Sequence, residues 1–487
     1  MSEKRITRRN ALKALFATTS VLSGCGGGSG AGEPAAPASS VLPPAGSPPP
    51  APTPPAPAPP RPSSSPAVFP LQALSGKRFL TDSAGRPFFL LGDMAWSMAS
   101  NLSREEVVEY MNNRQQKGFN TLALGLVEHY YSKHTPAWQN HYGHEPFSVT
   151  GDFSTPNDDY WQMIDFIFQQ ASLRNMLVLA FHSYNGYEGG VEGWYEKMKS
   201  NGVPKLFSYG QFLGSRYSAF NNVLWMSGGD YDAPNKALLK AVVNGINSVV
   251  PNSLHSHHGH RETDALTHWS GDLDWLSVNS LYDRLGMSAS LAHHAYASRN
   301  WKPFFRIENT FEQPAVSDTT IRMLAYGSVL QGGMGAVYGH VAVWPFGGRY
   351  LVYSPLNWRQ AMDSAVARSM TYFAALFTAR SWTKLVPDYG TRTLMTNGWG
   401  DDGDFNFAAL ANDGSFGIAY FSSVPSGLTI DLSKLAGPKV ECRWYDPTNA
   451  EYRHIATLPA SGLKVFDPVG DNAGGLRDWV LVVETTV

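Results

Sequence analysis

Cysteine is scarce in this sequence, which contains only Cys25 and Cys442. Cys25 ends the N-terminal segment "MSEKRITRRNALKALFATTSVLSGC", which is typical of an export signal and does not belong to the fold. If Cys25 becomes acylated, the mature chain has no second cysteine for an intramolecular disulfide. A disulfide framework is therefore excluded, and Cys442 is expected to be an inert buried thiol.

The sequence also lacks an excess of positive charge, since its formal net charge is -2. It therefore shows no basic footprint for nucleic acid, and we expect no nucleic-acid partner. Aromatic residues are plentiful, at 13% of the chain. This content suits a large core, and it also suits clefts in which flat rings stack on sugar faces.

The N-terminal segment also lacks an apolar run long enough for a transmembrane helix, because its apolar part is short and contains polar residues. "TRRNALK", with Arg8 and Arg9, resembles the twin-arginine export signal, and "LSGC" resembles a bacterial lipoprotein cleavage box. We predict a signal over residues 1–25, lipidation of Cys25, and export to the bacterial cell envelope, at the periplasm or outer surface. An ordinary cleaved signal that leaves no anchor is the alternative.

Residues 26–68 are rich in Pro, Ala, Gly and Ser. Such a composition cannot bury a core and favours extended polyproline geometry. We interpret the segment as a semi-rigid tether between membrane and folded chain. A proline-rich ligand for a partner domain is the alternative.

Residues 69–385 alternate apolar strands with helices. Ser103 and Glu106 form a capping box for the first long helix, and Gly118 ends it. A second helix is predicted to open with Thr155 as N-cap and Pro156 in the first turn. The eight predicted strands lie in the segments 87–93, 120–131, 176–186, 222–230, 253–260, 275–283, 303–312 and 335–344.

This alternation predicts the α/β class, with a (β/α)8 TIM barrel. A doubly wound open sheet is the rival, but no glycine-rich phosphate fingerprint follows the first strand. Residues 386–487 instead show short alternating segments separated by Asp-Gly, Pro-Ser-Gly and Asp-Pro turns. They predict a small all-β antiparallel sandwich, which we expect to pack against the barrel or to act as a binding module.

Polar side chains recur where the predicted strands end, which is where barrels of this kind carry their chemistry. Two acids stand out: Asp230 follows two glycines, and Glu308 ends the apolar strand "PFFRI". Glycoside hydrolysis needs one protonated and one ionised carboxyl group beside the scissile bond. We predict Asp230 and Glu308 as the catalytic pair. The predicted substrate-binding residues are Asp93, Trp96, Glu128, His182, Tyr184, Asn279, Tyr282, Tyr338 and His340.

Each acid also has a structural alternative. A strand-end carboxylate can cap the next helix or pair with an arginine, and Arg306 lies two residues before Glu308. The occurrence of both acids, on the fourth and seventh strands of one barrel, favours catalysis.

Several long motifs, among them "PFFLLGDMAW", "VLWMSGGD", "KPFFRIENTFE" and "GAVYGHVAVW", resemble the apiosidase-like catalytic domain of glycoside hydrolase family 140. "RWYDPTNAEY" and "DWVLVVE" resemble the collagen-binding type of C-terminal domain that usually follows it. The resemblance implies a retaining barrel enzyme with Asp230 as acid/base and Glu308 as nucleophile. It also implies apiose-type furanosides or related plant cell-wall side chains as substrates. "HSHHGHRETDALTHW" matches the family only loosely.

Two rival hypotheses remain. His255, His257, His258 and His260 form a dense cluster, but strand alternation would send the first two and the last two to opposite faces. No His-Glu-x-x-His motif is present, so we expect no catalytic metal and no cofactor. The other rival is a catalytically inactive, surface-anchored carbohydrate-binding protein. The expected partners are an oligo- or polysaccharide and, through the anchor, a membrane, with the chain a monomer.

Overall fold

The computed structural model describes residues 66–283, 288–349, 352–399, 406–422, 427–468 and 470–486. The predicted signal, the lipidation site Cys25 and nearly all of the proline-rich segment lie outside these residues. Among the helices in the described ranges, none is both long and apolar enough to cross a membrane.

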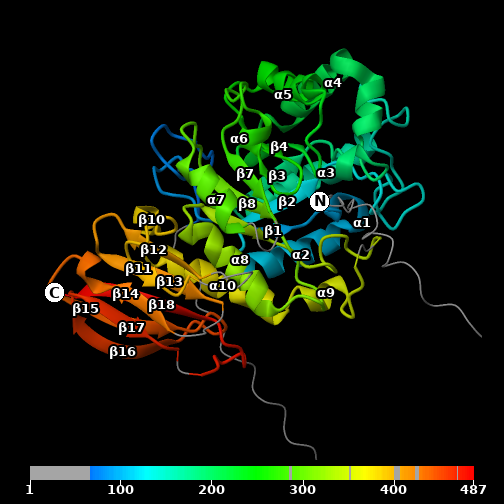
Figure 1. The fold of residues 1–487 in the computed structure, drawn as a ribbon. Helices are drawn as coiled ribbons and strands as arrows, with labels where there is room; N and C mark the ends of the chain where they lie inside the picture. Colours follow the sequence, from blue (N-terminus) through cyan, green and yellow to red (C-terminus); the bar gives the residue numbers. More distant parts are fainter. Residues whose placement is uncertain are drawn as a thin grey trace, which may run out of the picture. The chain divides into compact units, whose positions relative to one another are not determined.

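Eight parallel strands form a barrel in the described part of the chain (Figure 1). They hydrogen-bond in the order β5-β4-β3-β2-β1-β9-β8-β7. The ring closes where the amides of Ser277 and Val278 donate to the carbonyl of His255, at 2.8 and 3.3 Å. The strands are β1 (Leu90–Met94), β2 (Thr121–Gly125), β3 (Leu177–Phe181), β4 (Val223–Gly228), β5 (Leu254–His258), β7 (Asn279–Tyr282), β8 (Phe304–Glu308) and β9 (Gly335–Tyr338).

A short additional strand, β6 (Thr263–Asp264), pairs antiparallel with β7. Closure of the ring confirms the (β/α)8 barrel and excludes the open doubly wound sheet. The α-helices are α1 (Met98–Asn101), α2 (Arg104–Gln116), α3 (Asp158–Leu173), α4 (Tyr195–Tyr217), α5 (Lys236–Val249), α6 (Ala265–His268), α7 (Ser288–Ala297), α8 (Asp318–Leu330), α9 (Trp358–Ala361) and α10 (Ala365–Thr378). Short 3-10 helices cover Tyr187–Gly189, Trp382–Lys384 and Leu432–Lys434.

The start of α2 is as predicted and the start of α3 is not. Ser103 accepts from the amide of Glu106, and the Glu106 carboxylate accepts from the amide of Ser103, which completes the capping box. For α3 the N-cap is Asn157, so the prediction that Thr155 caps this helix is wrong. The Thr155 hydroxyl instead donates to the carbonyl of Asp152, at 2.9 Å, and so closes the preceding turn.

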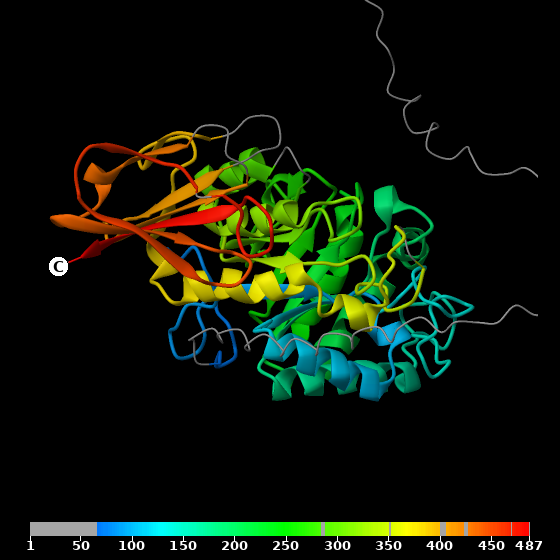
Figure 2. The same cartoon turned by 90° about the horizontal axis from the view of Figure 1, so that it is seen from below.

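The C-terminal region contains two antiparallel sheets, drawn in orange and red in Figure 2, and this confirms the predicted sandwich. The six-stranded sheet has the order β10-β12-β13-β18-β15-β16, and the three-stranded sheet has the order β11-β14-β17. The strands are β10 (Leu385–Pro387), β11 (Met395–Asn397), β12 (Phe407–Ala411), β13 (Phe416–Phe421), β14 (Leu428–Asp431), β15 (Lys439–Tyr445), β16 (Tyr452–Pro459), β17 (Leu463–Phe466) and β18 (Trp479–Thr486).

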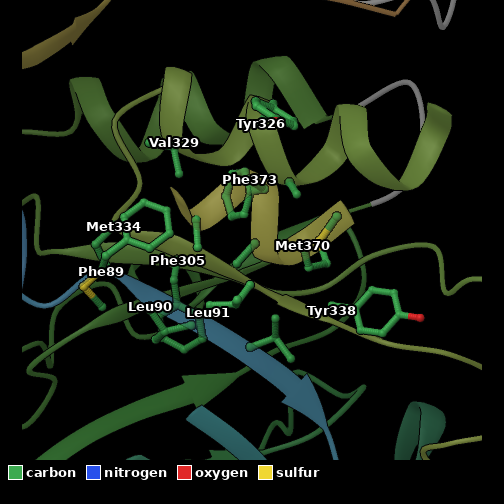
Figure 3. Packing of buried hydrophobic residues seen from close by; sticks show 14 of the residues in the cluster. Phe89, Leu90, Leu91, Phe305, Tyr326, Val329, Met334, Tyr338, Met370 and Phe373 are labelled. Atoms are coloured by element: carbon green, nitrogen blue, oxygen red, sulfur yellow. The ribbon is translucent and has the colours of Figure 1, made fainter. Parts of the chain in front are cut away.

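One hydrophobic cluster continues from the barrel into the six-stranded sheet. Helix α8 packs against barrel strands β8 and β9 and against β12 and β13. Figure 3 shows side chains of α8 and α10, including Tyr326 and Phe373, over those of β1 and β8. Tyr326 also stacks on Tyr420 of β13, with ring centroids 4.7 Å apart. The expected packing of the C-terminal region against the barrel is therefore confirmed.

A buried ion pair lies in the same contact. Arg322 of α8 donates to both carboxylate oxygens of Asp478, at 2.6 and 2.8 Å. The hydroxyl of Tyr420 donates to Asp478 as well, at 2.8 Å. The charges of Arg322 and Asp478 are thus satisfied away from water, as a buried pair requires.

Candidate active site

A pocket lies at the carboxyl ends of the barrel strands. Its lining comes from strand ends and from the loops that follow them, which is where the sequence placed the chemistry. The lining residues are Met94, Trp96, Tyr131, Tyr184, Asp230, His258, Glu308, Phe311 and Trp344.

Asp230 reaches this pocket through an unusual turn. Gly228, Gly229 and Asp230 have φ values of 86, 121 and 53°, all in the region that favours glycine. A Cβ atom on Gly229 would lie 2.3 Å from a ring carbon of Tyr184. The close approach that the glycines allow is thus made by the Tyr184 ring, whose hydroxyl donates to Asp230 Oδ2 at 2.6 Å. The N-cap position of helix α5 is Asn235, so Asp230 is not its cap.

Glu308 faces Asp230 across the pocket, and His258 bridges them. His258 Nε2 lies 3.0 Å from Glu308 Oε2 and 3.9 Å from Asp230 Oδ1. One ring nitrogen of His258 and one carboxylate oxygen each of Asp230 and Glu308 all lie within 4.8 Å of one another. Arg306 forms a buried ion pair with Asp283, Nε to Oδ2 at 2.8 Å. The arginine two residues before Glu308 therefore has a carboxylate partner at another strand end.

The surroundings of Asp230 and His258 change the pKa of each side chain. Burial and the negative charge of Glu308 raise the pKa of Asp230 to about 6, against the opposing effects of His258 and Tyr184. Burial disfavours a charged His258, but the hydrogen bond to Glu308 and the charges of both acids outweigh it and raise the pKa of His258 above its ordinary value. A protonated Asp230 can therefore coexist with a cationic His258 beside Glu308.

Aromatic rings form much of the pocket wall. Trp96 packs edge-on against Phe181 and Tyr184, with centroids 4.9 and 5.1 Å apart. Tyr131 and Trp344 meet in the same manner at 4.8 Å. An apolar, ring-lined pocket with a few convergent polar groups is typical of a small-ligand site.

Four of the predicted site residues line this pocket together: Asp230, Glu308, Trp96 and Tyr184. A fifth predicted residue, Tyr282, is not among the lining residues but contacts one of them. Its ring packs on His258 at 4.9 Å, and its hydroxyl accepts from Arg261 at 3.1 Å. Tyr282 thus contacts the histidine that bridges the acids.

The structure places two other predicted residues in structural interactions. Asp93 is fully buried and accepts from Arg114 Nε and from the Tyr110 hydroxyl, each at 2.5 Å. Glu128 Oε1 accepts from the backbone amides of residues 129–131 at 2.8–3.0 Å, so it shapes the loop after β2. Neither carboxylate is among the pocket-lining residues of the described chain.

The remaining predicted residues, His182, Asn279, Tyr338 and His340, are buried and are also not among those lining residues. Burial lowers the pKa of His182 to about 3, which keeps its ring neutral. The Tyr338 hydroxyl donates to Glu312, and His340 Nδ1 accepts from the amide of Ala342 at 2.9 Å. Asn279 accepts from the amide of Leu266 at 3.4 Å.

His258 is a pocket residue that the sequence did not assign to the site. The alternation of the histidine cluster did carry the signal, because His255 bonds to Asn247 of α5 and His257 stacks on His268 of α6. His258 points the other way, toward Glu308. Tyr131, Phe311 and Trp344 were also missed, and the last two lie on loops where an apolar side chain gives no sequence signal of a pocket.

Residues 74–384 match the family model "Apiosidase-like, catalytic domain", and residues 386–484 match "Putative collagen-binding domain of a collagenase". The chain is also similar to a glycoside hydrolase family 5 structure from Bacteroides vulgatus ATCC 8482, with a TM-score of 0.74 and 23% identity over 86% of this chain and 95% of that one. A second structure, described as a glycoside hydrolase, gives a TM-score of 0.74 and 22% identity over 86% of this chain and 98% of that one. At these identities the likeness shows a shared fold.

Among curated proteins, none matches the chain. The catalytic-domain model, however, covers more than half of the sequence and ends where the C-terminal strands begin. The protein belongs to the apiosidase-like catalytic domain family.

Proposed function

We propose that the protein is a retaining glycoside hydrolase in which Asp230 is the acid/base and Glu308 the nucleophile. The observation that carries this proposal is the spacing of the two acids, whose facing oxygens lie within 4.8 Å of each other. Carboxyl groups stand about 5–5.5 Å apart in retaining enzymes and about 6.5–9.5 Å apart in inverting ones, which must hold a water between them. The short gap supports direct attack by a carboxylate.

The surroundings of the two acids support the roles of Asp230 as acid/base and Glu308 as nucleophile. Asp230, with its pKa raised to about 6, keeps a protonated fraction near neutral pH for donation to the leaving oxygen. Glu308 accepts a hydrogen bond from His258 at 3.0 Å, which holds its carboxyl group in the pocket opposite Asp230.

The reaction has two steps. Asp230 donates its proton to the glycosidic oxygen while Glu308 attacks the anomeric carbon, so that a glycosyl–enzyme ester forms and the alcohol leaves. Asp230 then takes a proton from water, whose oxygen displaces Glu308 and releases the sugar. The Tyr184 hydroxyl orients Asp230 throughout, and Trp96 offers a flat ring to the sugar.

Membership of the apiosidase-like family favours an apiose-type furanoside, or a related side chain of a plant cell-wall polysaccharide, as substrate. A screen of aryl glycosides and pectic oligosaccharides, with product configuration followed by NMR, identifies the sugar and tests retention. Binding without release of reducing sugar by the wild-type protein would instead support the inactive carbohydrate-binding protein.

Variants of the two acids test the assignment directly. Asp230→Ala and Glu308→Ala should fold and lose hydrolysis by several orders of magnitude, whereas Glu312→Gln, which alters an acid outside the pocket lining, should remain active. Added azide should yield a glycosyl azide of retained configuration with Asp230→Ala and of inverted configuration with Glu308→Ala. Normal turnover by either alanine variant would end the assignment.

We also propose that the protein is exported and anchored through a lipid on Cys25, on the strength of the twin-arginine and lipobox-like motifs. Cys25→Ala should move the protein from the membrane to the soluble fraction of cells. An unchanged distribution would contradict the anchor.

A further inference from the structure

A second cluster of possible ligands lies next to the acid/base loop but outside the pocket lining. Asp232 follows Asp230 in the loop between β4 and α5, His257 belongs to β5, and His268 ends α6. One donor atom from each side chain lies within 4.8 Å of the other two. His268 Nδ1 is 3.7 Å from Asp232 Oδ1, and the rings of His257 and His268 stack at 4.9 Å.

His257 has polar atoms that nothing else in the described chain satisfies. Its side chain is 0% exposed, and neither of its ring nitrogens has a hydrogen-bond partner among the described residues. His268 Nε2 likewise has no partner within these ranges. Because buried polar groups in proteins are nearly always paired, an unpaired buried imidazole aimed at a second imidazole and a carboxylate indicates a missing ligand.

The charges next to the cluster are of both signs. Lys236 brings a positive charge, since its Nζ donates to the carbonyl of His268, while the Asp232 carboxylate supplies negative charge. A histidine ligates a metal ion through a nitrogen lone pair of the neutral ring, and a carboxylate ligates it through oxygen.

We propose that Asp232, His257 and His268 bind a divalent transition metal ion of the zinc type, and that this ion fastens the Asp230 loop to β5 and α6. Two imidazoles and one carboxylate form a donor set that zinc accepts, with water completing the coordination. Metal–ligand bonds of about 2.0–2.2 Å place tetrahedral donors roughly 3.4 Å apart, so the three side chains close in on the ion. The Asp232 side chain is 29% exposed and its Oδ1 accepts from the amide of His260 at 2.9 Å, whereas the His257 ring is held against Gly228.

The site is structural and not catalytic. His257 and His258 leave β5 on opposite faces, and only His258 faces the acids. The ion would act on catalysis only by restricting the loop that leads from Asp230 to Asp232. Its presence does not depend on whether the pocket hydrolyses a glycoside.

Calorimetric titration of EDTA-dialysed Glu308→Ala protein with Zn²⁺ tests the proposal. This background removes one ligand of the Asp230, His258 and Glu308 group, which is the other set of side chains close enough to hold an ion among the described residues. We expect one Zn²⁺ per chain, with a Kd in the micromolar range or below, and a melting temperature that rises on binding. In the same background, His268→Gln and Asp232→Asn should each weaken binding at least tenfold and abolish the rise.

His255→Gln is the matched control, because His255 is a buried histidine of the same strand whose ring already bonds to Asn247. It should bind Zn²⁺ as the parent does. The absence of saturable 1:1 binding in the parent, or equal affinity in folded Asp232→Asn and His268→Gln, would overturn the site. Since no step requires hydrolysis, failure of this experiment is distinguishable from failure of the proposed reaction.

Discussion

At the scale of single residues, Asp230 carries a stability cost that follows from its surroundings. Its pKa rises from 3.8 in the unfolded chain to about 6 in the fold, so the folded protein binds this proton more tightly. The fold therefore loses stability relative to the unfolded chain as pH rises from about 4 through 6. Each pKa unit corresponds to about 1.4 kcal/mol, and partial exposure of the side chain, 19%, reduces the total to about 1–2 kcal/mol.

Asp230→Asn should consequently stabilise the protein at pH 7.5 by about 1–2 kcal/mol, because the amide accepts from Tyr184 without a charge to desolvate. Urea unfolding of both proteins at pH 7.5 and at pH 4 measures this difference. It should largely vanish at pH 4, where the wild-type carboxyl is protonated in the fold. A difference of the same size at both pH values would exclude the raised pKa as its cause.

His258 is a positioning residue whose charge lowers the pKa of Asp230. His258→Gln can keep a hydrogen bond to Glu308 but removes that charge, so the alkaline limb of the kcat/KM profile should move to higher pH. We expect kcat to fall about tenfold to a hundredfold, within the usual range for a group assisting proton transfer. Lower activity with an unmoved limb would indicate a packing effect alone, and His255→Gln serves as the control.

At the scale of elements, the barrel strands could be predicted because parallel strands buried on both faces are continuous apolar runs. The polar residues that end each run could be identified as well, because they interrupt the apolar pattern. Which of those ends line the pocket could not be predicted, since Asp93 and Asp230 look alike in sequence. Asp93 is buried by Arg114, a residue on α2, and Glu128 is bound by the amides of its own loop. These hydrogen-bond partners depend on the tertiary structure and cannot be identified from the local sequence.

The turn between β4 and α5 can be tested by a substitution at Gly229. Gly229→Ala should lower hydrolysis by more than a hundredfold, because its Cβ would overlap the Tyr184 ring and displace the hydroxyl that orients Asp230. Initial rates and a melting curve measure the effect. Gly143→Ala is the control, since Gly143 has a φ of 83° but nothing within 4 Å of an added Cβ. Its rate should be unchanged, and equal losses in both variants would contradict the steric explanation.

At the scale of the whole molecule, the barrel and the six-stranded sheet share one core and should unfold together. Asp478→Ala leaves Arg322 buried without its carboxylate, which costs about 3–5 kcal/mol when a buried pair is broken. Denaturant unfolding followed by fluorescence and circular dichroism should give one coincident transition at a lower midpoint.

A neighbouring surface pair provides the control for this variant. Asp471 pairs with Arg477, and their side chains are 55% and 82% exposed. Asp471→Ala should change the free energy of unfolding by less than about 1 kcal/mol. Two separate transitions in the wild-type protein would show that the two regions fold independently.

Helix α8 follows the strand that ends in Glu308, and its outer face carries the ring that stacks on Tyr420. Gly327 on this helix lies so close to β12 that a Cβ atom would be 2.7 Å from the Phe407 ring. A chimera that joins a foreign C-terminal module to this barrel must therefore present a surface that packs closely against helix α8.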